Sequence, residues 1–219
     1  MNLDVILPKD GPSKSEVSKY LKKYSNENIV IKCGGSVLDD PLLFDDFIKD
    51  ITILKKLNFN IVVVHGGGKK ISAKLNSLNI ESKFIDGSRV SNAEIISHIE
   101  EVLIKFNMDI SVSFKKHSCE VERITSKNQN IIFVTQEDKK LGFVGKPKSI
   151  KINILKNIIS SGKVPVIAPL GLDDKGQVFN INADTVAGFI AKILQARRLI
   201  IASDVIGVMD EHSSLITEK

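Results

Sequence analysis

The chain alternates between short continuous apolar runs and longer segments in which apolar residues recur every three or four positions. The continuous runs predict buried strands and lie at 29–32, 61–65, 130–135, 164–171 and 199–205. The periodic segments lie between these runs and predict amphipathic helices. Strands and helices therefore follow one another repeatedly, and this order predicts an α/β protein with a mostly parallel central sheet and right-handed crossovers.

Each predicted helix carries one apolar stripe. The stripe after the first strand contains Phe44, Phe47, Ile48, Ile51 and Leu54, and later stripes lie within 71–78, 95–106, 154–159 and 186–193. Tight turns are predicted at 86–87 and 174–176, and the glycine-containing segment 139–150 is expected to be a loop. "SNAE" at 91–94 predicts a capping box, in which Ser91 accepts a backbone hydrogen bond and Glu94 reaches back.

A further amphipathic helix is predicted before the first strand. From Ser15 onward Val17, Tyr20, Leu21 and Tyr24 share one face, whereas lysines occupy the others. Such a helix either packs on its own domain or binds a neighbouring subunit, and its position ahead of the first strand favours the second. Residues 1–27 are therefore interpreted as an N-terminal extension.

Composition narrows the class of protein. Hydrophobic residues make up 42% of the 219 positions, and no apolar run approaches the roughly 20 residues that span a bilayer. The N-terminus lacks the pattern of a secretory signal, and two cysteines make neither a disulfide framework nor a metal set. These features favour a cytoplasmic location. The net charge is +5, but the lysines are scattered and aromatic residues are only 5%, which argues against nucleic-acid binding.

Glycines follow the first two predicted strands directly, in "VIKCGGS" at 30–36 and "VVVHGGGKK" at 62–70. Both junctions would lie at the carboxyl ends of parallel strands, where doubly wound proteins bind ligands. Glycine lets backbone N–H groups approach a ligand, and a following helix N-terminus favours an anion. Neither stretch is a Walker A loop or a dinucleotide-binding fingerprint. Each junction is therefore either a phosphate- or carboxylate-binding loop or only a tight turn.

Four charged or amide side chains lie next to these junctions or at the ends of other predicted elements. Lys32 ends an apolar strand directly before glycine, where it can meet phosphate oxygens or reach out to solvent. Arg89 follows the predicted hairpin and could bind a carboxylate or lie on the surface. Asn180 and Asp184 lie at a hairpin end and a helix start, where Asn182 or Asp184 could also cap the helix.

Taken together, six stretches resemble the amino acid kinase family. They are "VIKCGGS", "VVVHGGGKKI", "FIDGSRVSN", "LGFVGKPKSI", "FNINADTVA" and "ASDVIGVMD", and they occur in the family's order over residues 15–219. Within the family, the chain is similar to the branch that phosphorylates the side-chain carboxylate of N-acetyl-L-glutamate in arginine synthesis. The resemblance implies a three-layer αβα sandwich, with a substrate-binding lobe at 28–178 and the start of a nucleotide-binding lobe at 179–219.

The resemblance also implies roles for single residues. Lys32 and Asp184 would be catalytic, with Lys32 compensating charge on the transferred phosphoryl group and Asp184 orienting that lysine. The substrate would be bound by Gly67, Gly68, Arg89 and Asn180. The nucleotide would be bound by Gly34, Gly35, Asp204, Val205, Ile206, Gly207, Val208 and Met209. ATP would be the phosphoryl donor and Mg²⁺ would bridge its phosphates, so no dedicated protein metal site is expected.

Partners and activity follow from the same resemblance. N-acetyl-L-glutamate would be the substrate, and the chain would form a homo-oligomer, a dimer or a hexamer joined through the N-terminal helix, with arginine as an inhibitor. The family's later G-G-M-x-x-K segment, which supplies a second phosphate-binding lysine, does not occur, so the fold is expected to be incomplete at its C-terminal end. Two alternatives to the kinase therefore stay open: a ligand-binding relic without catalysis, and a kinase for another amino acid or carbamate.

Overall fold

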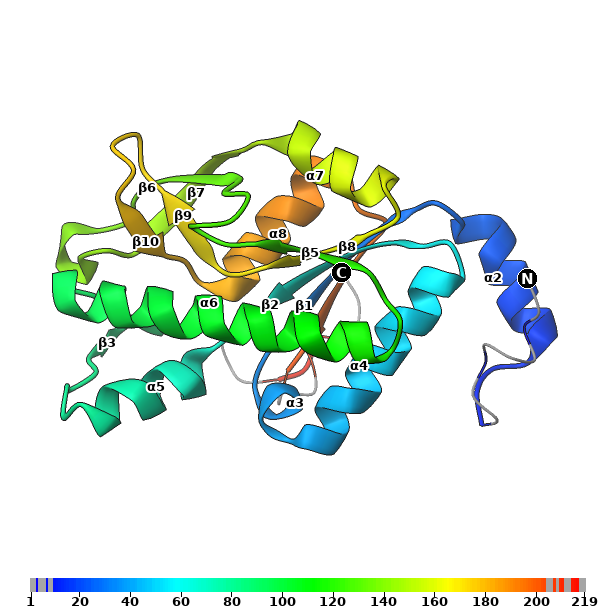
Figure 1. Cartoon of the computed structure of the whole chain (residues 1–219), viewed down its shortest axis with the longest axis horizontal. Helices are drawn as coiled ribbons and strands as arrows, with labels where there is room; N and C mark the ends of the chain where they lie inside the picture. The colour runs from blue at the N-terminus through cyan, green and yellow to red at the C-terminus, as the bar shows by residue number, and fades with distance from the viewer. Residues whose placement is uncertain are drawn as a thin grey trace.

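A five-stranded parallel sheet forms the centre of the molecule, as the alternating pattern predicts (Figure 1). The computed structural model describes residues 10–203 and, outside that range, residues 3, 7, 207, 209, 210 and 214–216. The strand order is β11-β1-β2-β8-β5. The bounds of these strands are β1 (Asn28–Cys33), β2 (Asn60–His65), β5 (Val121–Ile124), β8 (Val164–Ile167) and β11 (Arg198–Ala202).

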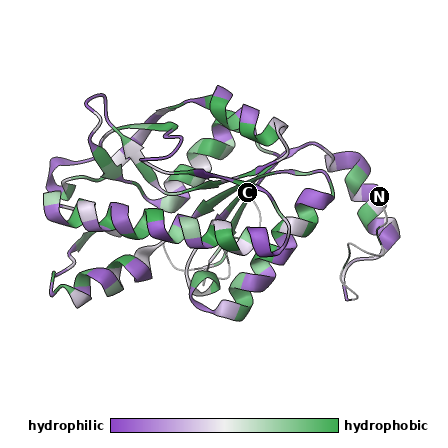
Figure 2. Cartoon of the chain, in the orientation of Figure 1, coloured by the Kyte–Doolittle hydropathy of each residue, from purple (hydrophilic) through white to green (hydrophobic). Residues whose placement is uncertain are grey.

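Helices cover both faces of this sheet, and strand residues alternate between the two sides. Ile29 and Ile31 of β1 pack in one buried cluster with residues of two helices, α4 (Pro41–Lys56) and α6 (Ala93–Lys116). Val30 packs in another cluster with residues of α7 (Ile152–Ser160) and α8 (Ala183–Leu194). The strands are accordingly apolar on both faces (Figure 2), as expected of a parallel sheet covered on each side. The predicted three-layer αβα sandwich is confirmed.

A second, four-stranded sheet has the order β10-β9-β6-β7. Its strands are β6 (Ile132–Gln136), β7 (Gly145–Ile150), β9 (Leu170–Leu172) and β10 (Val178–Asn180), and a 3₁₀ turn, η1 (Lys139–Leu141), precedes β7. The prediction that 139–150 is a loop is therefore wrong for residues 145–150, which form β7. Pro147 is tolerated there because β7 is an edge strand, and the pairing shifts register between Phe133 and Val134, which lies opposite Pro147.

Smaller elements lie at the carboxyl ends of the central strands. They are α3 (Ser36–Asp39), α5 (Gly68–Ser77) and a hairpin of β3 (Phe84–Ile85) and β4 (Ser88–Arg89). The predicted tight turn joins the two hairpin strands. Both of its residues have positive φ, 47° at Asp86 and 76° at Gly87, as a two-residue hairpin turn requires.

The predicted N-terminal helix is present as α2 (Lys14–Tyr24), which lies at one end of the molecule (Figure 1). A capping box between Ser13 and Glu16 begins it. Val17 is buried in the same cluster as α4, whereas Tyr20 stays 52% exposed. The helix therefore packs on its own domain through a narrow apolar face.

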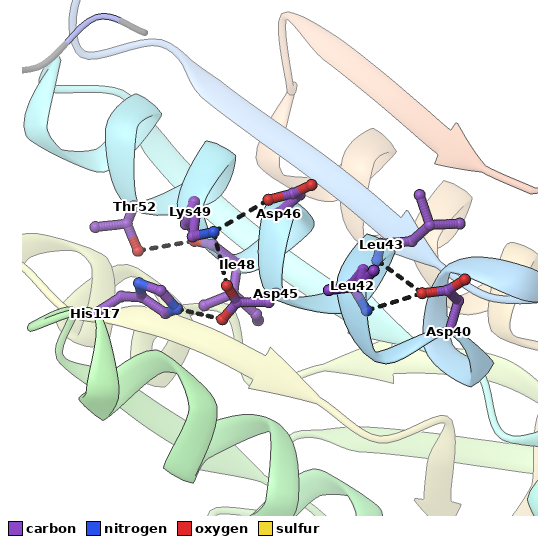
Figure 3. Close-up of polar contacts among 9 residues, drawn as sticks. All are labelled: Asp40, Leu42, Leu43, Asp45, Asp46, Ile48, Lys49, Thr52 and His117. Atoms are coloured by element: carbon purple, nitrogen blue, oxygen red, sulfur yellow. Dashed lines mark hydrogen bonds and ion pairs between the residues drawn. The ribbon is translucent and has the colours of Figure 1, made fainter.

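Polar contacts set the start of α4 and tie it to α6, as Figure 3 shows. Asp40 caps α4 by accepting hydrogen bonds from the backbone N–H groups of Leu42 and Leu43, at 2.8 and 3.1 Å. His117, the cap residue that follows Lys116 at the end of α6, lies 2.6 Å from the Asp45 carboxylate in the first turns of α4. The contact between His117 and Asp45 joins the C-terminal end of α6 to the start of α4.

The capping box predicted at 91–94 is wrong, because the cap of α6 is Asn92. The Asn92 side chain accepts from the backbone N–H of Ile95 at 2.9 Å. Ser91 is instead extended and buried, pairs with Gly142 in an isolated bridge, and donates its hydroxyl to the Arg89 carbonyl at 3.0 Å. Tertiary pairing of the backbone therefore shifts the helix start by one residue.

Gly142 is required at this bridge, and its replacement should destabilise the fold. Its φ is 70° with ψ at −123°, and a Cβ atom there would collide with the Ser91 carbonyl oxygen. Gly142→Ala is expected to lower the free energy of unfolding by about 2 kcal/mol more than Gly176→Ala. Gly176 is the matched control, because its φ is also positive, 80°, but a Cβ atom would have open space around it. Equal shifts of the two urea midpoints would contradict the close approach.

Candidate active site

One cavity of about 240 Å³ opens at the carboxyl ends of β1 and β2. The glycine loops that follow these strands line it, together with the hairpin β3–β4 and the start of α8. The lining includes these predicted site residues: Lys32, Gly34, Gly35, Gly67, Gly68, Arg89, Asn180 and Asp184. The structure therefore brings predicted residues from four separate stretches of the chain to one place, while their roles stay predictions.

Lys32 and Asp184 form an ion pair inside the cavity, with Lys32 Nζ 3.0 Å from Asp184 Oδ1. Lys32 and Val30 lie on the same side of β1, the side that α8 covers, so the lysine points toward the first turn of that helix. Asn182 caps α8 by accepting from the N–H groups of Asp184 and Thr185. The lysine side chain is only 12% exposed, whereas the aspartate is 51% exposed and open to the cavity.

The two glycine loops touch each other, and the second one begins a helix whose first residues line the cavity. The N–H of Gly66 donates to the Cys33 carbonyl at 2.7 Å and so joins the loops. Gly67 is the N-cap residue of α5 and makes no side-chain cap, so the first N–H groups of this helix have no intrahelical partner. An unpaired helix N-terminus of this kind favours an anion.

Arg89 is fixed before any ligand binds. Its guanidinium donates to the Ser72 hydroxyl at 2.8 Å, to the Gly68 carbonyl at 3.3 Å and to the Ser82 hydroxyl. The guanidinium carbon also lies 4.6 Å from the centre of the Phe84 ring. Burial lowers the pKa of Arg89 from its ordinary value, but a guanidinium stays charged in proteins. The cavity therefore contains a pre-oriented cation next to the glycine loop that follows β2.

Sequence reasoning did not identify the residues that hold Arg89. Ser72 lies on α5, one turn after Gly68, and Ser82 lies in the connection before β3. No local pattern marks either serine. Only the fold of the hairpin over α5 brings them to the arginine.

The predicted nucleotide segment lies mostly outside the described residues. This holds for Asp204, Val205, Ile206 and Val208. Gly207 and Met209 are described, and Met209 pairs with Leu215 in an isolated bridge, but neither lines the cavity. These six residues therefore stay predictions.

Two buried side chains lie under the glycine loops. Burial raises the pKa of the Cys33 thiol to about 12, so Cys33 acts as a packed apolar residue and not as a nucleophile. Burial also lowers the pKa of His65 to about 4, partly offset by its hydrogen bond to the Gly66 carbonyl. The imidazole is therefore neutral at physiological pH.

The depressed pKa of His65 predicts loss of stability in mild acid. An unfolded chain binds a proton at His65 below about pH 6.5, whereas the folded chain does so only below about pH 4. The unfolded state thus holds more protons in this window, and stability falls as the pH drops through it, by up to about 3 kcal/mol. Urea unfolding at pH 7 and pH 4 measures this loss. The His65→Asn variant should lose less, and an equal loss would contradict a buried neutral histidine.

Comparison with known proteins places these features in one family. Residues 27–219 match the model of the amino acid kinase family. The acetylglutamate kinase of Pelagibacter ubique is 58% identical over 97% of this chain and 74% of that protein. The acetylglutamate kinase of Clostridium acetobutylicum is 39% identical over 94% of this chain and 74% of that protein. The chain thus spans about three quarters of the length of these relatives.

Solved structures share the fold. A Streptococcus mutans protein, smu.665, superposes with a TM-score of 0.77 at 26% identity, over 84% of this chain and 75% of that chain. The N-acetylglutamate synthase of Neisseria gonorrhoeae complexed with coenzyme A and N-acetyl-glutamate has a TM-score of 0.79 at 16% identity, over 92% of this chain and 47% of that chain. At this identity the second likeness concerns the fold alone. From its matched residues and its relatives, the chain belongs to the amino acid kinase family, in the branch of the acetylglutamate kinases.

Proposed function

We propose that this chain transfers the γ-phosphoryl group of ATP to the side-chain carboxylate of N-acetyl-L-glutamate, a step of arginine synthesis. The observation that carries the proposal is a cavity that two glycine loops line together with the largely buried Lys32 and with Arg89. Both reactants are anions, and phosphoryl transfer depends on positioning and on compensation of negative charge. The cavity offers residues for both, since Lys32 and Arg89 carry positive charge and the glycine loops and Asn180 line the same space.

The proposed transfer needs no proton. One oxygen of the substrate carboxylate attacks the γ-phosphorus, the bond to the oxygen between the β- and γ-phosphorus atoms breaks, and ADP leaves with the electron pair. Lys32 compensates the charge that spreads over the phosphoryl oxygens. Asp184, 3.0 Å from the lysine nitrogen, keeps the ammonium group in the cavity.

Three groups would orient the substrate. The unpaired N–H groups of Gly67 and Gly68 would bind the reacting carboxylate, since they belong to a helix N-terminus. Arg89 would bind the second carboxylate as a fixed cation, held in place by its contacts with Ser72 and Gly68. Asn180 ends β10 with its side chain at the cavity wall, where it could bind the acetamido group.

ATP would enter over Gly34 and Gly35, in line with the family relationship. Mg²⁺ would reduce the charge of its phosphates. Asp184 is the one carboxylate among the described residues that line the cavity, so the donor set fits an ion held mainly by phosphate oxygens. We also propose the division into a substrate lobe at 28–178 and a nucleotide lobe from 179 onward.

The test exploits the chemistry of the product. An acyl phosphate reacts with hydroxylamine to give a hydroxamate, so turnover should yield ADP and hydroxamate only when both ATP and N-acetyl-L-glutamate are present. Carbamate and aspartate serve as competing acceptors. Turnover with either of these alone would favour another kinase of the family. Binding of N-acetyl-L-glutamate by calorimetry without any turnover would favour a ligand-binding relic.

We further propose a homo-oligomer joined through α2, with arginine as an inhibitor and a cytoplasmic location. The half-exposed Tyr20 and an apolar cavity between α2 and α4 support a role for this helix at an interface. Among the helices that the structure describes, none is long and apolar enough to cross a membrane.

Removal of residues 1–25 tests the role of the helix. The expected result is a smaller assembly by light scattering and weaker inhibition by arginine, with turnover retained. An unchanged mass would exclude the helix from the interface.

A further inference from the structure

Directly beneath the glycine loop after β2 lies a chain of polar side chains that does not line the cavity. Its members are His65 at the end of β2, Asn107 in the middle of α6 and Arg123 on β5. His65 and Asn107 are completely buried, at 0% exposure. Buried polar groups in an otherwise apolar layer are costly unless their hydrogen bonds are satisfied, so the direction of each bond is informative.

Each hydrogen bond among these three side chains sets the direction of the next one. Arg123 has only donors, so its Nε–H donates to Asn107 Oδ1 at 3.1 Å and thereby sets which way the amide faces. The Asn107 Nδ2 group then donates to the Val166 carbonyl at 2.9 Å and to His65 Nε2 at 3.2 Å. Because Nε2 accepts, the single proton of the neutral imidazole is on Nδ1.

The proton on Nδ1 acts on the glycine loop. His65 Nδ1 lies 2.8 Å from the Gly66 carbonyl oxygen, which can only accept, so the imidazole donates to it. The peptide between Gly66 and Gly67 is trans and planar, so a carbonyl turned toward the imidazole turns the Gly67 N–H the opposite way. Gly67 lines the cavity, and an N–H that is turned away from the imidazole could donate there to an anion.

We propose that Asn107 is a positioning residue for phosphoryl transfer, which fixes the tautomer of His65 and so keeps the Gly67 N–H aimed into the cavity. The inference rests on the proposed function. A control of this kind is needed because two consecutive glycines leave the peptide free to rotate. A flipped peptide would present the Gly66 carbonyl to the cavity, where it would repel a carboxylate or phosphate.

The first measurement is made on the imidazole itself and does not depend on activity. Nitrogen NMR of the full chain, with histidines labelled, should show His65 protonated at Nδ1. In Asn107→Leu, which has a similar volume but no donor, the Nε2-protonated form should appear. Protonation of the wild-type ring at Nε2 would overturn the inference whatever the chain catalyses.

The second measurement links the tautomer to turnover. Asn107→Leu and Arg123→Met should each lower kcat about a hundredfold, with the KM for ATP changed no more than threefold. Ser111→Ala is the matched control: Ser111 is buried on the same helix and loses one hydrogen bond, to the Asn107 carbonyl, while the chain to His65 stays intact. Its kcat should be unchanged.

The outcomes distinguish the proposed function of the protein from the positioning role of Asn107. A tautomer change in Asn107→Leu with kcat retained would overturn the positioning role. A similar loss of kcat in Ser111→Ala would overturn it too, because the effect would then be one of stability. A wild-type chain without turnover would refute the proposed function. The affinity of Asn107→Leu for N-acetyl-L-glutamate would then test the positioning role of Asn107. A tenfold loss of affinity is expected, and an unchanged affinity would overturn the role.

Discussion

Replacement of Lys32 by methionine is expected to lower kcat about a thousandfold, while N-acetyl-L-glutamate still binds. Methionine keeps much of the volume of the lysine side chain but removes its positive charge. Among the described residues that line the cavity, Lys32 and Arg89 are the two cations. In a low-dielectric cavity such a charge acts on the phosphoryl group more strongly than it would in water. Steady-state kinetics with the hydroxamate assay measures the change.

Two controls separate charge from structure. Lys192→Met removes an exposed lysine of α8 and should leave kcat unchanged. Urea unfolding of Lys32→Met should shift the free energy by no more than about 1 kcal/mol, because the partner Asp184 is half exposed and water replaces the lysine. A kcat within tenfold of the wild type would remove Lys32 from the catalytic role.

Replacement of Arg89 by lysine should raise the KM for N-acetyl-L-glutamate about a hundredfold with a smaller effect on kcat. The planar guanidinium places its charge and donors in a fixed orientation, which the flexible ammonium group of a lysine cannot match. The lysine also cannot keep the contacts with Ser72 and Ser82 that orient the fork. Initial rates over a range of substrate concentrations measure the effect.

A substrate analogue provides the control for Arg89. The α-carboxamide of N-acetyl-L-glutamate lacks the carboxylate that Arg89 would bind, so the wild type and Arg89→Lys should use it equally poorly. If the variant still loses a hundredfold with this analogue, Arg89 acts on stability or on the loop and not on that carboxylate. Thermal unfolding of both proteins identifies the first of these.

The candidate site could be predicted from the sequence where its signals are local. Glycines directly after apolar strands and a lysine at a strand end mark the carboxyl edge of a parallel sheet within a few residues each. The structure brings Lys32 to the cavity, as this logic expects, together with Asp184 and with Arg89, whose place there was implied only by the family resemblance. The groups that hold them in place are not marked in this way, since Ser72 and Ser82 have no local pattern.

Two elements show where local patterns mislead. Serine is a common helix-cap residue, but the backbone of Ser91 is already paired with Gly142, so Asn92 caps the helix instead. Proline is typical of loops, but Pro147 lies on an edge strand, where its missing backbone N–H is tolerated. Each outcome depends on a partner that the neighbouring residues do not reveal.

The α/β order and the parallel sheet follow from local patterns in the sequence, because apolar periodicity depends on near neighbours and on burial. Glycine junctions likewise mark the carboxyl edge of that sheet, where the cavity opens. Which hydrogen-bond partners meet depends instead on the tertiary structure. Asn107 reaches His65 across 42 positions of sequence and Val166 across 59. The direction in which the Gly67 N–H points depends on those distant partners, since a glycine backbone carries no preference of its own strong enough to set it.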